Sequence, residues 1–190
     1  MDWERRYTEG DTPWDRGTAH PALDGLLAQN VLQGKTLVPG CGAGHDVRLL
    51  ARHHLRVTGL DIAPSAIERA RNFAPVNNET YLCEDFFALP KEWKQSFDSI
   101  LEHTCFCAIE PNRRADYIRS ATTALKPGGR FLAVFYTDME DQDGEPPFGA
   151  TTGDLDALFG KHFRLLEEYR GMPTFPGREG CETIRLLARI

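Results

Sequence analysis

The chain has 190 residues, 41% of them hydrophobic, and a formal net charge of −6 from 28 acidic and 22 basic side chains. This length suits a single domain over residues 1–190. The scattered charges argue against nucleic-acid binding. The polar first residues argue against a secretory signal, and the lack of a long apolar run argues against a membrane span. Five cysteines in no regular framework favour reduced thiols, so we expect a cytoplasmic protein. We also favour a monomer.

Predicted strands and helices alternate along the chain. Residues 1–20 are expected to be irregular or briefly helical, and Pro21 can open a helix. Apolar runs predict seven strands, at residues 35–38, 56–60, 80–83, 97–101, 130–136, 163–169 and 182–188. Helical periodicity predicts further helices at residues 45–54, 65–73, 111–125 and 152–159. This order favours an α/β fold with a doubly wound, mostly parallel seven-stranded sheet, whose last two strands pair antiparallel at an edge.

The most informative segment is the glycine-rich turn between the first two predicted strands. An apolar run meets Gly40-Cys41-Gly42-Ala43-Gly44, and the next strand ends on Asp61. This is the layout of a nucleotide-binding unit, where glycines let the backbone approach a ligand and the acid accepts the ribose hydroxyls. The spacing is G-x-G-x-G rather than the dinucleotide G-x-G-x-x-G, which favours a nucleoside without phosphates such as S-adenosylmethionine (SAM). We therefore expect cofactor contacts at Gly40, Cys41, Gly42, Gly44 and Asp61.

Further candidate cofactor residues follow the second and third predicted strands. In an open α/β sheet the ligand lies beyond the carboxyl ends of the strands, which brings the glycine turn, residues 84–86 and residues 102–107 to one crevice. Asp85 suits the adenine amino group and Phe86 the ring face, although Asp85 is also suited to cap the helical turn that follows. Ile62 packs either on the adenine or on the core.

Three aromatic side chains stand out in the otherwise polar first twenty residues. Trp3 and Tyr7 lie one helical turn apart and can share a face, and Trp14 follows. They form either a hydrophobic lid on a sheet edge or an aromatic wall around the sulfonium of SAM, a cation that aromatic faces attract by up to about 2 kcal/mol when desolvated. An N-terminal lid over residues 1–20 that closes on the cofactor satisfies both interpretations.

His103, Cys105 and Cys107 are close enough in sequence to be considered as metal ligands. Their spacing fits no standard zinc pattern, and a second ligand pair is missing. We therefore expect buried thiols near a strand end and no metal.

The chain contains the motifs Trp3-Glu4-x-x-Tyr7, Thr12-Pro13-Trp14-Asp15, Leu37-Val38-Pro39-Gly40-Cys41-Gly42-Ala43-Gly44-His45-Asp46 and Gly59-Leu60-Asp61-Ile62. They resemble motifs of the thiopurine S-methyltransferase superfamily, and the resemblance spans nearly the whole chain. Others resemble its halide and thiol (thiocyanate) methyltransferase branch, namely Glu84-Asp85-Phe86-Phe87, Phe106-Cys107-Ala108-Ile109-Glu110-Pro111, Leu125-Lys126-Pro127-Gly128-Gly129 and Asp143-Gly144-x-Pro146-Pro147-Phe148. The resemblance implies a class I, Rossmann-like methyltransferase with SAM as cofactor and S-adenosylhomocysteine as product.

The resemblance also implies roles for individual residues. SAM contacts are implied at Trp3, Tyr7, Trp14, Gly40, Asp61, Asp85, Phe86 and His103. Tyr136 falls on a tyrosine position of the acceptor pocket, whose further apolar candidates are Trp14, Phe106 and Phe148. Two positions depart from the plant relatives, since Tyr7 stands where they tend to have Trp and His103 where they have Tyr.

The implied reaction is an in-line displacement by a small soft nucleophile such as thiocyanate, halide, hydrosulfide or an organic thiol. The sulfonium supplies the leaving group, so the enzyme has mainly to align and desolvate the acceptor. His103 and Tyr136 are the candidate catalytic residues; His103 either deprotonates a thiol, binds the anion or is a structural histidine. Arg178 can attract an anionic acceptor, but an exposed surface arginine is the favoured interpretation.

Three alternatives stay open at this point. Within the superfamily, the acceptor is instead an aromatic thiol, a thiopurine or a metalloid, against which the short loops argue weakly. A nucleotide-dependent dehydrogenase shares the nucleotide-binding unit, but the glycine spacing and the lack of a second mononucleotide half oppose it. A SAM-binding module without catalysis is opposed by the complete glycine turn and the aromatic wall.

Overall fold

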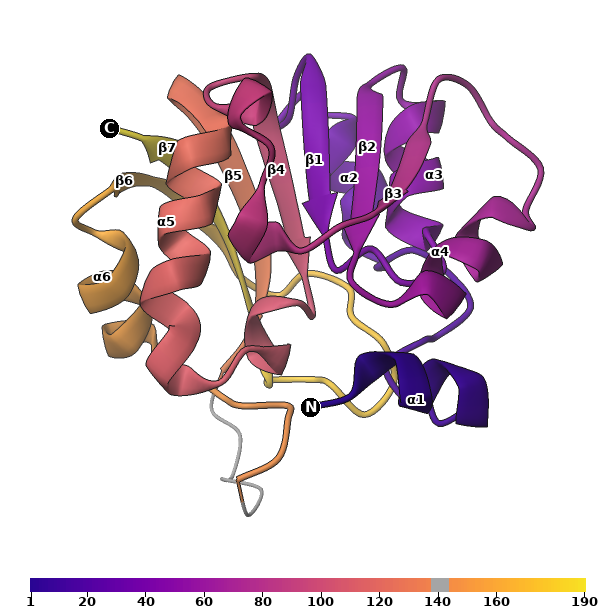
Figure 1. The fold of residues 1–190 in the computed structure, drawn as a ribbon. Coiled ribbons are helices and arrows are strands. Elements are labelled where there is room, and N and C mark those ends of the chain that lie inside the picture. The colour runs from indigo at the N-terminus through magenta and orange to yellow at the C-terminus, as the bar shows by residue number, and fades with distance from the viewer. Residues whose placement is uncertain (138–143) are drawn as a thin grey trace.

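The computed structural model describes residues 1–137 and 144–190, and within them seven strands form one sheet in the order β3-β2-β1-β4-β5-β7-β6 (Figure 1). The strands are β1 (Lys35–Pro39), β2 (Arg56–Asp61), β3 (Thr80–Cys83), β4 (Phe97–His103), β5 (Leu125–Tyr136), β6 (Phe163–Tyr169) and β7 (Glu182–Arg189). Strands β1 to β5 pair in parallel, whereas β7 is antiparallel to both β5 and the edge strand β6.

Helices cover both faces of the sheet (Figure 1). They are α1 (Trp3–Glu9), α2 (Leu23–Leu27), α3 (His45–Arg52), α4 (Pro64–Arg71), α5 (Arg114–Ala124) and α6 (Thr152–Phe159). Helices α2 and α3 pack on one face and α5 and α6 on the other, while α1 lies across the carboxyl ends of the strands and contacts α4. The doubly wound, mostly parallel sheet predicted from the sequence is confirmed.

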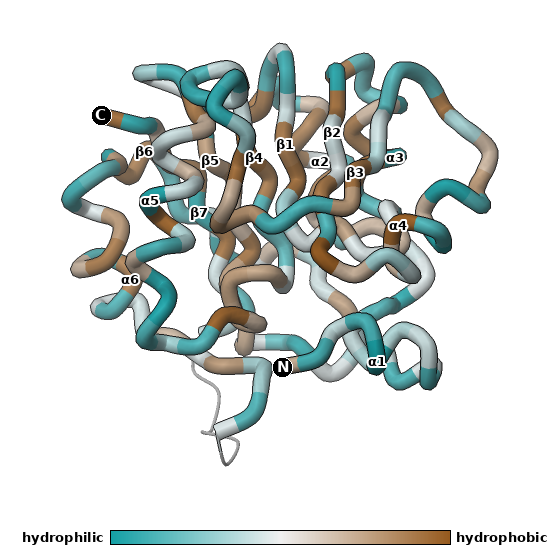
Figure 2. Tube along the Cα trace, viewed as in Figure 1, coloured by the Kyte–Doolittle hydropathy of each residue, from teal (hydrophilic) through white to brown (hydrophobic). Residues whose placement is uncertain are grey.

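Neighbouring residues on each central strand belong to opposite cores, because successive side chains of a strand point to opposite faces of the sheet. Leu37, Ile100 and Phe131 pack toward α5 and α6, whereas Val38 and Leu101 pack toward α2 and α3. All five are buried. Figure 2 shows these strands as brown, hydrophobic stretches within a more hydrophilic periphery. Continuous apolar runs are what parallel strands buried on both faces require.

Element boundaries differ from the prediction in two informative places. The helix predicted at 111–125 begins with a separate 3-10 turn, Pro111–Arg113, before the α-helix proper. The helix that Pro21 was expected to open has only the five residues of α2, and the chain then turns through Asn30 with φ 56°. Both differences are at helix ends, where sequence patterns are least decisive.

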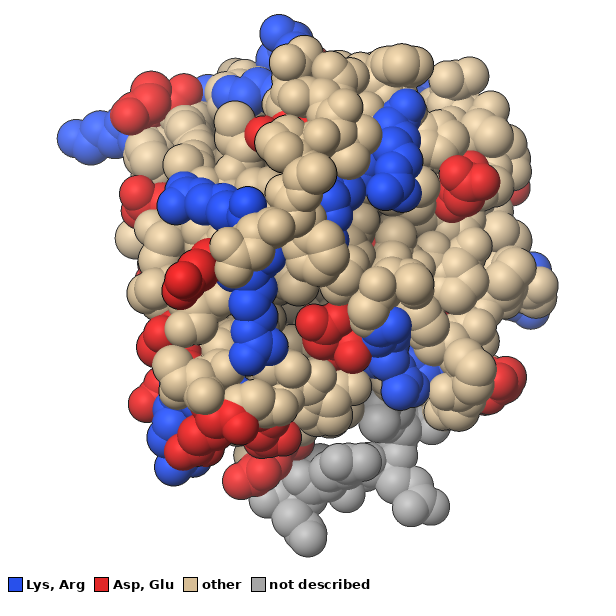
Figure 3. All heavy atoms as spheres, turned by 90° about the vertical axis from the view of Figure 1, so that its right-hand side faces the viewer, with Lys and Arg blue, Asp and Glu red and all other residues tan. Residues whose placement is uncertain are grey.

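One predicted motif is only partly covered by the structure, because Asp143 and the acidic residues before it lie outside the described residues. Within the described ranges, no helix is long and apolar enough to cross a membrane. On the face of the molecule seen in Figure 3, basic and acidic side chains are interspersed, in agreement with the scattered charges of the sequence.

Candidate functional site

A large cavity lies at the carboxyl ends of the central strands, beside the N-terminal segment. Its volume of about 640 Å³ is in the range of about 300–1,000 Å³ that small-molecule sites occupy. Its walls contain many of the side chains predicted from separate motifs, namely Trp3, Trp14, Gly40, Asp61, Ile62, Asp85, Phe86, Tyr136, Phe148 and Arg178. The fold therefore brings the predicted cofactor and acceptor residues together at one edge of the sheet.

The glycine turn and Asp61 form a rigid corner of this cavity. Gly40 has φ 59°, and a Cβ atom there would lie 2.8 Å from Sγ of Cys105, so the turn needs glycine. Oδ2 of the buried Asp61 accepts a hydrogen bond from the backbone N–H of Gly42 at 2.9 Å, and Oδ1 accepts from Ala63 at 3.0 Å. Burial raises the pKa of the Asp61 carboxyl, and the backbone donors oppose that shift. Each oxygen keeps lone-pair capacity, which fits the two hydroxyls of a ribose.

The opposite wall of the same corner is suited to an adenine ring. Oδ1 of Asp85 accepts from the backbone N–H of Phe87 at 2.8 Å, so the capping interpretation is confirmed. Asp85 also lines the cavity, together with the buried ring of Phe86 and the exposed side chain of Ile62. The cap fixes the carboxylate and leaves its second oxygen for a ligand amino group.

A second, smaller cavity of about 50 Å³ adjoins the first. Gly40, Trp14 and Thr104 line both cavities, which makes them neighbours across a shared wall. Besides Trp14 and Gly40, the small cavity is lined by four further predicted cofactor residues, Tyr7, Cys41, Gly42 and His103. Its position beside the glycine turn is where an extension of a bound nucleoside would lie.

Two predicted site residues line neither cavity. Gly44 has φ 74° at the start of α3, and a Cβ there would lie 2.6 Å from the ring of Tyr81, so this glycine serves packing. Phe106 was expected in the acceptor pocket, but its ring is buried in the core because the 3-10 turn that it begins points it inward. Its neighbours Cys105 and Cys107 line the large cavity instead.

The aromatic residues of the N-terminal segment form one cluster. Ring centroids of Trp3 and Trp14 are 5.4 Å apart, those of Tyr7 and Trp14 are 5.7 Å apart, and Nε1 of Trp14 donates to Oη of Tyr7 at 3.1 Å. Tyr7 is buried against α4, and the Glu4 carboxylate accepts from both the backbone N–H and the hydroxyl of Ser65. The segment is thus attached to the body of the protein beside Asp61.

Arg178 differs from its favoured sequence interpretation, because it is buried rather than exposed, with 6% of its surface accessible. Its guanidinium lies 4.9 Å from the ring centroid of Tyr136, and Nη1 donates to Oε1 of Glu182 at 3.3 Å. Burial raises the pKa of Tyr136, opposed by Arg178, so the phenol is a neutral hydrogen-bond donor. The loop before β7 folds back over the strand ends and places this cation at the cavity.

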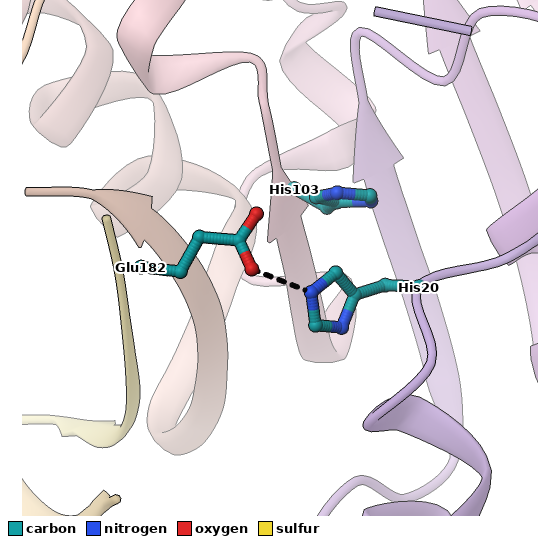
Figure 4. A group of neighbouring side chains, drawn as sticks. All are labelled: His20, His103 and Glu182. Atoms are coloured by element: carbon teal, nitrogen blue, oxygen red, sulfur yellow. Dashed lines mark hydrogen bonds and ion pairs between the residues drawn. The ribbon is translucent and has the colours of Figure 1, made fainter. Parts of the chain in front are cut away.

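His103 points away from the large cavity into a group of buried polar side chains. Its Nδ1 lies 2.7 Å from Oδ2 of Asp46, and its ring meets that of His20 at a centroid distance of 4.9 Å. His20 comes from the N-terminal segment and binds Glu182 at the start of β7 (Figure 4). Burial acts to lower the pKa of His103, but the Asp46 carboxylate outweighs it, and the net shift is upward.

The same three side chains, His20, His103 and Glu182, place possible metal-ligand atoms within 4.8 Å of one another. The hydrogen bonds fit a polar network better. The backbone N–H of Ala22 donates to Nδ1 of His20, so the ring proton is on Nε2, the atom that a metal would need. Glu182 already accepts from Thr174, His20 and Arg178. In the described residues, Cys105 and Cys107 join no group of three such ligands.

The sequence placed the segment after β4 at the crevice, but it did not indicate which side chains of that segment line the cavity. Thr104, Cys105 and Cys107 line the large cavity, and the thiols are free, as expected. Burial, followed by the charge of Glu102, raises the pKa of Cys107 to about 12 and that of Cys105 well above its usual value, so both are protonated. Their position directly after a central parallel strand was the signal that could have identified them.

Comparisons with known proteins agree with this geometry. A family model described as thiopurine S-methyltransferase matches residues 1–178. Thiocyanate methyltransferase 1 of Brassica oleracea is 39% identical over 153 residues, which cover 77% of this chain and 66% of that protein. A probable thiol methyltransferase 2 of Arabidopsis thaliana is 36% identical over 161 residues, which cover 82% of this chain and 70% of that protein.

The fold is shared with solved methyltransferases. A 1,6-didemethyltoxoflavin-N1-methyltransferase of Burkholderia thailandensis, with that substrate and S-adenosylhomocysteine bound, superposes with a TM-score of 0.73. It is 21% identical, and the match covers 99% of this chain and 85% of that one. At this identity the likeness concerns the fold.

Proposed function

Because this chain belongs to the thiopurine S-methyltransferase family and is a SAM-dependent methyltransferase, we propose that it methylates a small soft nucleophile. The observation that carries the proposal is one cavity that joins a nucleoside corner, Asp61 and Asp85, to a wall with Arg178, Tyr136 and Cys105. Relatives named for thiocyanate and thiol substrates support this acceptor class.

The residues around the acceptor end favour nucleophiles that are already anionic. SAM, when bound, supplies a sulfonium whose methyl carbon is open to in-line displacement. The buried guanidinium of Arg178 offers positive potential, and the neutral phenol of Tyr136 offers a donor. The thiols of Cys105 and Cys107 are protonated and so do not compete as nucleophiles. Alignment and desolvation by this wall are the chain's contribution to the rate.

The proposal is tested by headspace gas chromatography on the full chain with SAM and a panel of iodide, bromide, thiocyanate, hydrosulfide and small thiols. We expect a volatile methylated product from at least one member, and loss of that product in Arg178→Met. A matched control is Arg164→Met on the exposed face of β6. Absence of product from the entire panel, with SAM binding intact, would contradict this acceptor class.

An aromatic thiol is the second candidate, and a specific observation favours it. The cavity of about 640 Å³ also contains Phe148, Pro146 and Pro147, a flat apolar wall that a halide does not need. The same assay with thiophenol and a mercaptopurine, followed by liquid chromatography, distinguishes the two. A larger kcat/KM for either aromatic thiol than for every small acceptor would favour the second candidate.

A further inference from the structure

Directly behind the turn from Thr104 to Ala108, which we call the acceptor wall, lies a buried carboxylate that forms no ion pair within residues 1–137 and 144–190. Glu102, the penultimate residue of β4, has none of its surface exposed and does not line either cavity. Its Oε1 accepts from the backbone N–H of Phe106 at 2.7 Å, and its Oε2 accepts from the hydroxyl of Tyr117 on α5. Burying an acid that forms no ion pair is costly, so such a residue at a site edge calls for a functional reason.

The segment that Glu102 binds is the acceptor wall itself. Thr104 has φ 61°, a left-handed conformation that β-branched residues rarely adopt. Strained residues of this kind persist only where the surroundings fix them, and they cluster at functional sites. The Glu102–Phe106 hydrogen bond closes the turn that contains Thr104, and Thr104, Cys105 and Cys107 line the large cavity.

The same turn also supports the other side of the acceptor end. The carbonyl of Cys107 accepts from the backbone N–H of Phe148, another residue of the large cavity, at 2.7 Å. Arg114 of α5 donates to the carbonyl of Phe148 at 2.8 Å. A displacement of the turn would therefore move two walls of the cavity.

We propose that Glu102 is the positioning residue of the acceptor site, and that its negative charge keeps the turn from Thr104 to Ala108 in the geometry that aligns the nucleophile. The inference rests on the proposed function for the identity of the acceptor. Two donors, the Tyr117 hydroxyl and the Phe106 amide, point at the carboxylate, which matches the ionised form. A protonated Glu102 would have to donate to Tyr117, leaving that hydroxyl without its present acceptor.

The charge of Glu102 changes in the physiological range. Burial raises the pKa of Glu102 to about 7, opposed by the hydrogen bonds from Tyr117 and Phe106. The titratable groups that face it are Tyr117, His103, Cys105 and Cys107. The turn is therefore held by a full charge above neutral pH and by a weaker, neutral contact below it.

The test compares wild type with Glu102→Gln and Glu102→Ala, using iodide and thiocyanate as acceptors because neither has a proton to lose. For wild type we expect kcat/KM for the acceptor to rise from pH 6 to pH 8 with an apparent pKa near 7, and for Glu102→Gln a flat profile. Glu102→Ala should lose about tenfold to a hundredfold in kcat/KM for the acceptor, because small misplacements cost rate steeply, with less than about a twofold change in the Kd for SAM.

Hydrogen exchange of residues 103–108, measured by mass spectrometry and corrected for intrinsic exchange, supplies a readout that needs no acceptor. Exchange of the Phe106 amide should be faster in Glu102→Ala than in wild type, and faster in wild type at pH 6 than at pH 8. If wild type methylates neither iodide nor thiocyanate, the proposed acceptor class fails, and this exchange pattern still decides the role of Glu102. Unchanged exchange in Glu102→Ala, or identical pH profiles for wild type and Glu102→Gln, would overturn the inference.

Discussion

The clearest residue-scale lesson concerns two buried acids that differ in what surrounds them. Asp61 accepts from two backbone N–H groups and borders the large cavity, so its charge can also meet a ligand. Glu102 accepts from one backbone N–H and one tyrosine hydroxyl, and it lines neither cavity. Burial raises the pKa of both. The position of the carboxylate relative to the cavity, rather than the shift of its pKa, separates an acid that binds a ligand from an acid that positions other residues.

Asp61 should contribute directly to cofactor affinity. Asp61→Ala removes the carboxylate that we propose as acceptor for the ribose hydroxyls, and we expect SAM binding to weaken by roughly 1–3 kcal/mol. Asp61→Asn keeps one carbonyl oxygen and should lie between that variant and wild type. Isothermal calorimetry with SAM measures the effect, with Asp116→Ala on α5 as the control, because Asp116 pairs with Arg119 and lines neither cavity. Equal affinities for Asp61→Ala and wild type would remove this residue from the site.

The ionisation of Glu102 should lower the stability of the folded protein as the pH rises. Its pKa is about 7 in the folded protein against 4.5 in the unfolded chain, so between these values the folded state binds more protons. The contribution of Glu102 to the free energy of unfolding therefore falls by up to roughly 3 kcal/mol from about pH 4.5 to pH 7, and this contribution is constant above pH 7. Glu102→Gln lacks this term, so its stability relative to wild type should increase over that range.

Urea denaturation of both proteins at pH 5 and pH 8 measures this change, and the comparison across pH cancels any constant effect of the substitution. Glu84→Gln, an exposed neighbour of the cavity, is the control. A stability difference between Glu102→Gln and wild type that is the same at both pH values would argue against a titrating Glu102.

At the scale of elements, α1 and the turn after it behave as a unit that covers the cavity. The unit is attached through Glu4 to Ser65, and Trp3 and Trp14 line the cavity. The strands and their core do not depend on it, because both large clusters of buried hydrophobic residues begin after residue 20. Its removal should therefore open the site without unfolding the sheet.

Deletion of residues 2–16 is expected to abolish methyl transfer and to leave the far-ultraviolet circular dichroism of the remaining chain nearly unchanged. Loss of the aromatic cluster opens the cavity to water and removes the proposed aromatic contact with the sulfonium. Arg5→Ala, which breaks only an exposed pair with Glu9, is the matched control and should retain full activity. Full activity of the truncated protein would reduce the segment to a packing role.

Sequence patterns were sufficient for the elements because they depend on local periodicity. The bounds of β3, β6 and α6 agree with the prediction, and the remaining strands differ mainly at their ends. The burial of Arg178 could not be predicted in this way, since it depends on a long-range fold of the loop before β7 onto Tyr136. The side-chain direction of Phe106 depends on a 3-10 turn, which carries no clear pattern in the sequence.

At the scale of the whole molecule, one polar network joins four distant parts of the chain. Asp46 at the start of α3 binds His103 at the end of β4 and the backbone N–H of His20. His20 in turn binds Glu182 of β7, which binds Arg178 at the large cavity. The placement of His103 in this network supports the structural interpretation of this histidine over that of an acceptor base, because Nδ1 is already engaged and the ring does not line the large cavity.

This network should make stability depend on pH through His103. The net upward shift of the His103 pKa means that its stabilising charge is fully present below the unfolded value of 6.5 and is lost as the pH rises through the folded value. His103→Phe removes this contribution and leaves Asp46 without its imidazole partner, so it should destabilise the protein at every pH, and more at pH 6 than at pH 9.

His53→Phe, which breaks the exposed pair with Asp24, is the control. Thermal unfolding across pH measures both effects, and the ratio of iodide to thiol transfer should be the same in His103→Phe as in wild type. A ratio that changes with the substitution, or a stability loss that grows toward pH 9, would return His103 to the acceptor chemistry.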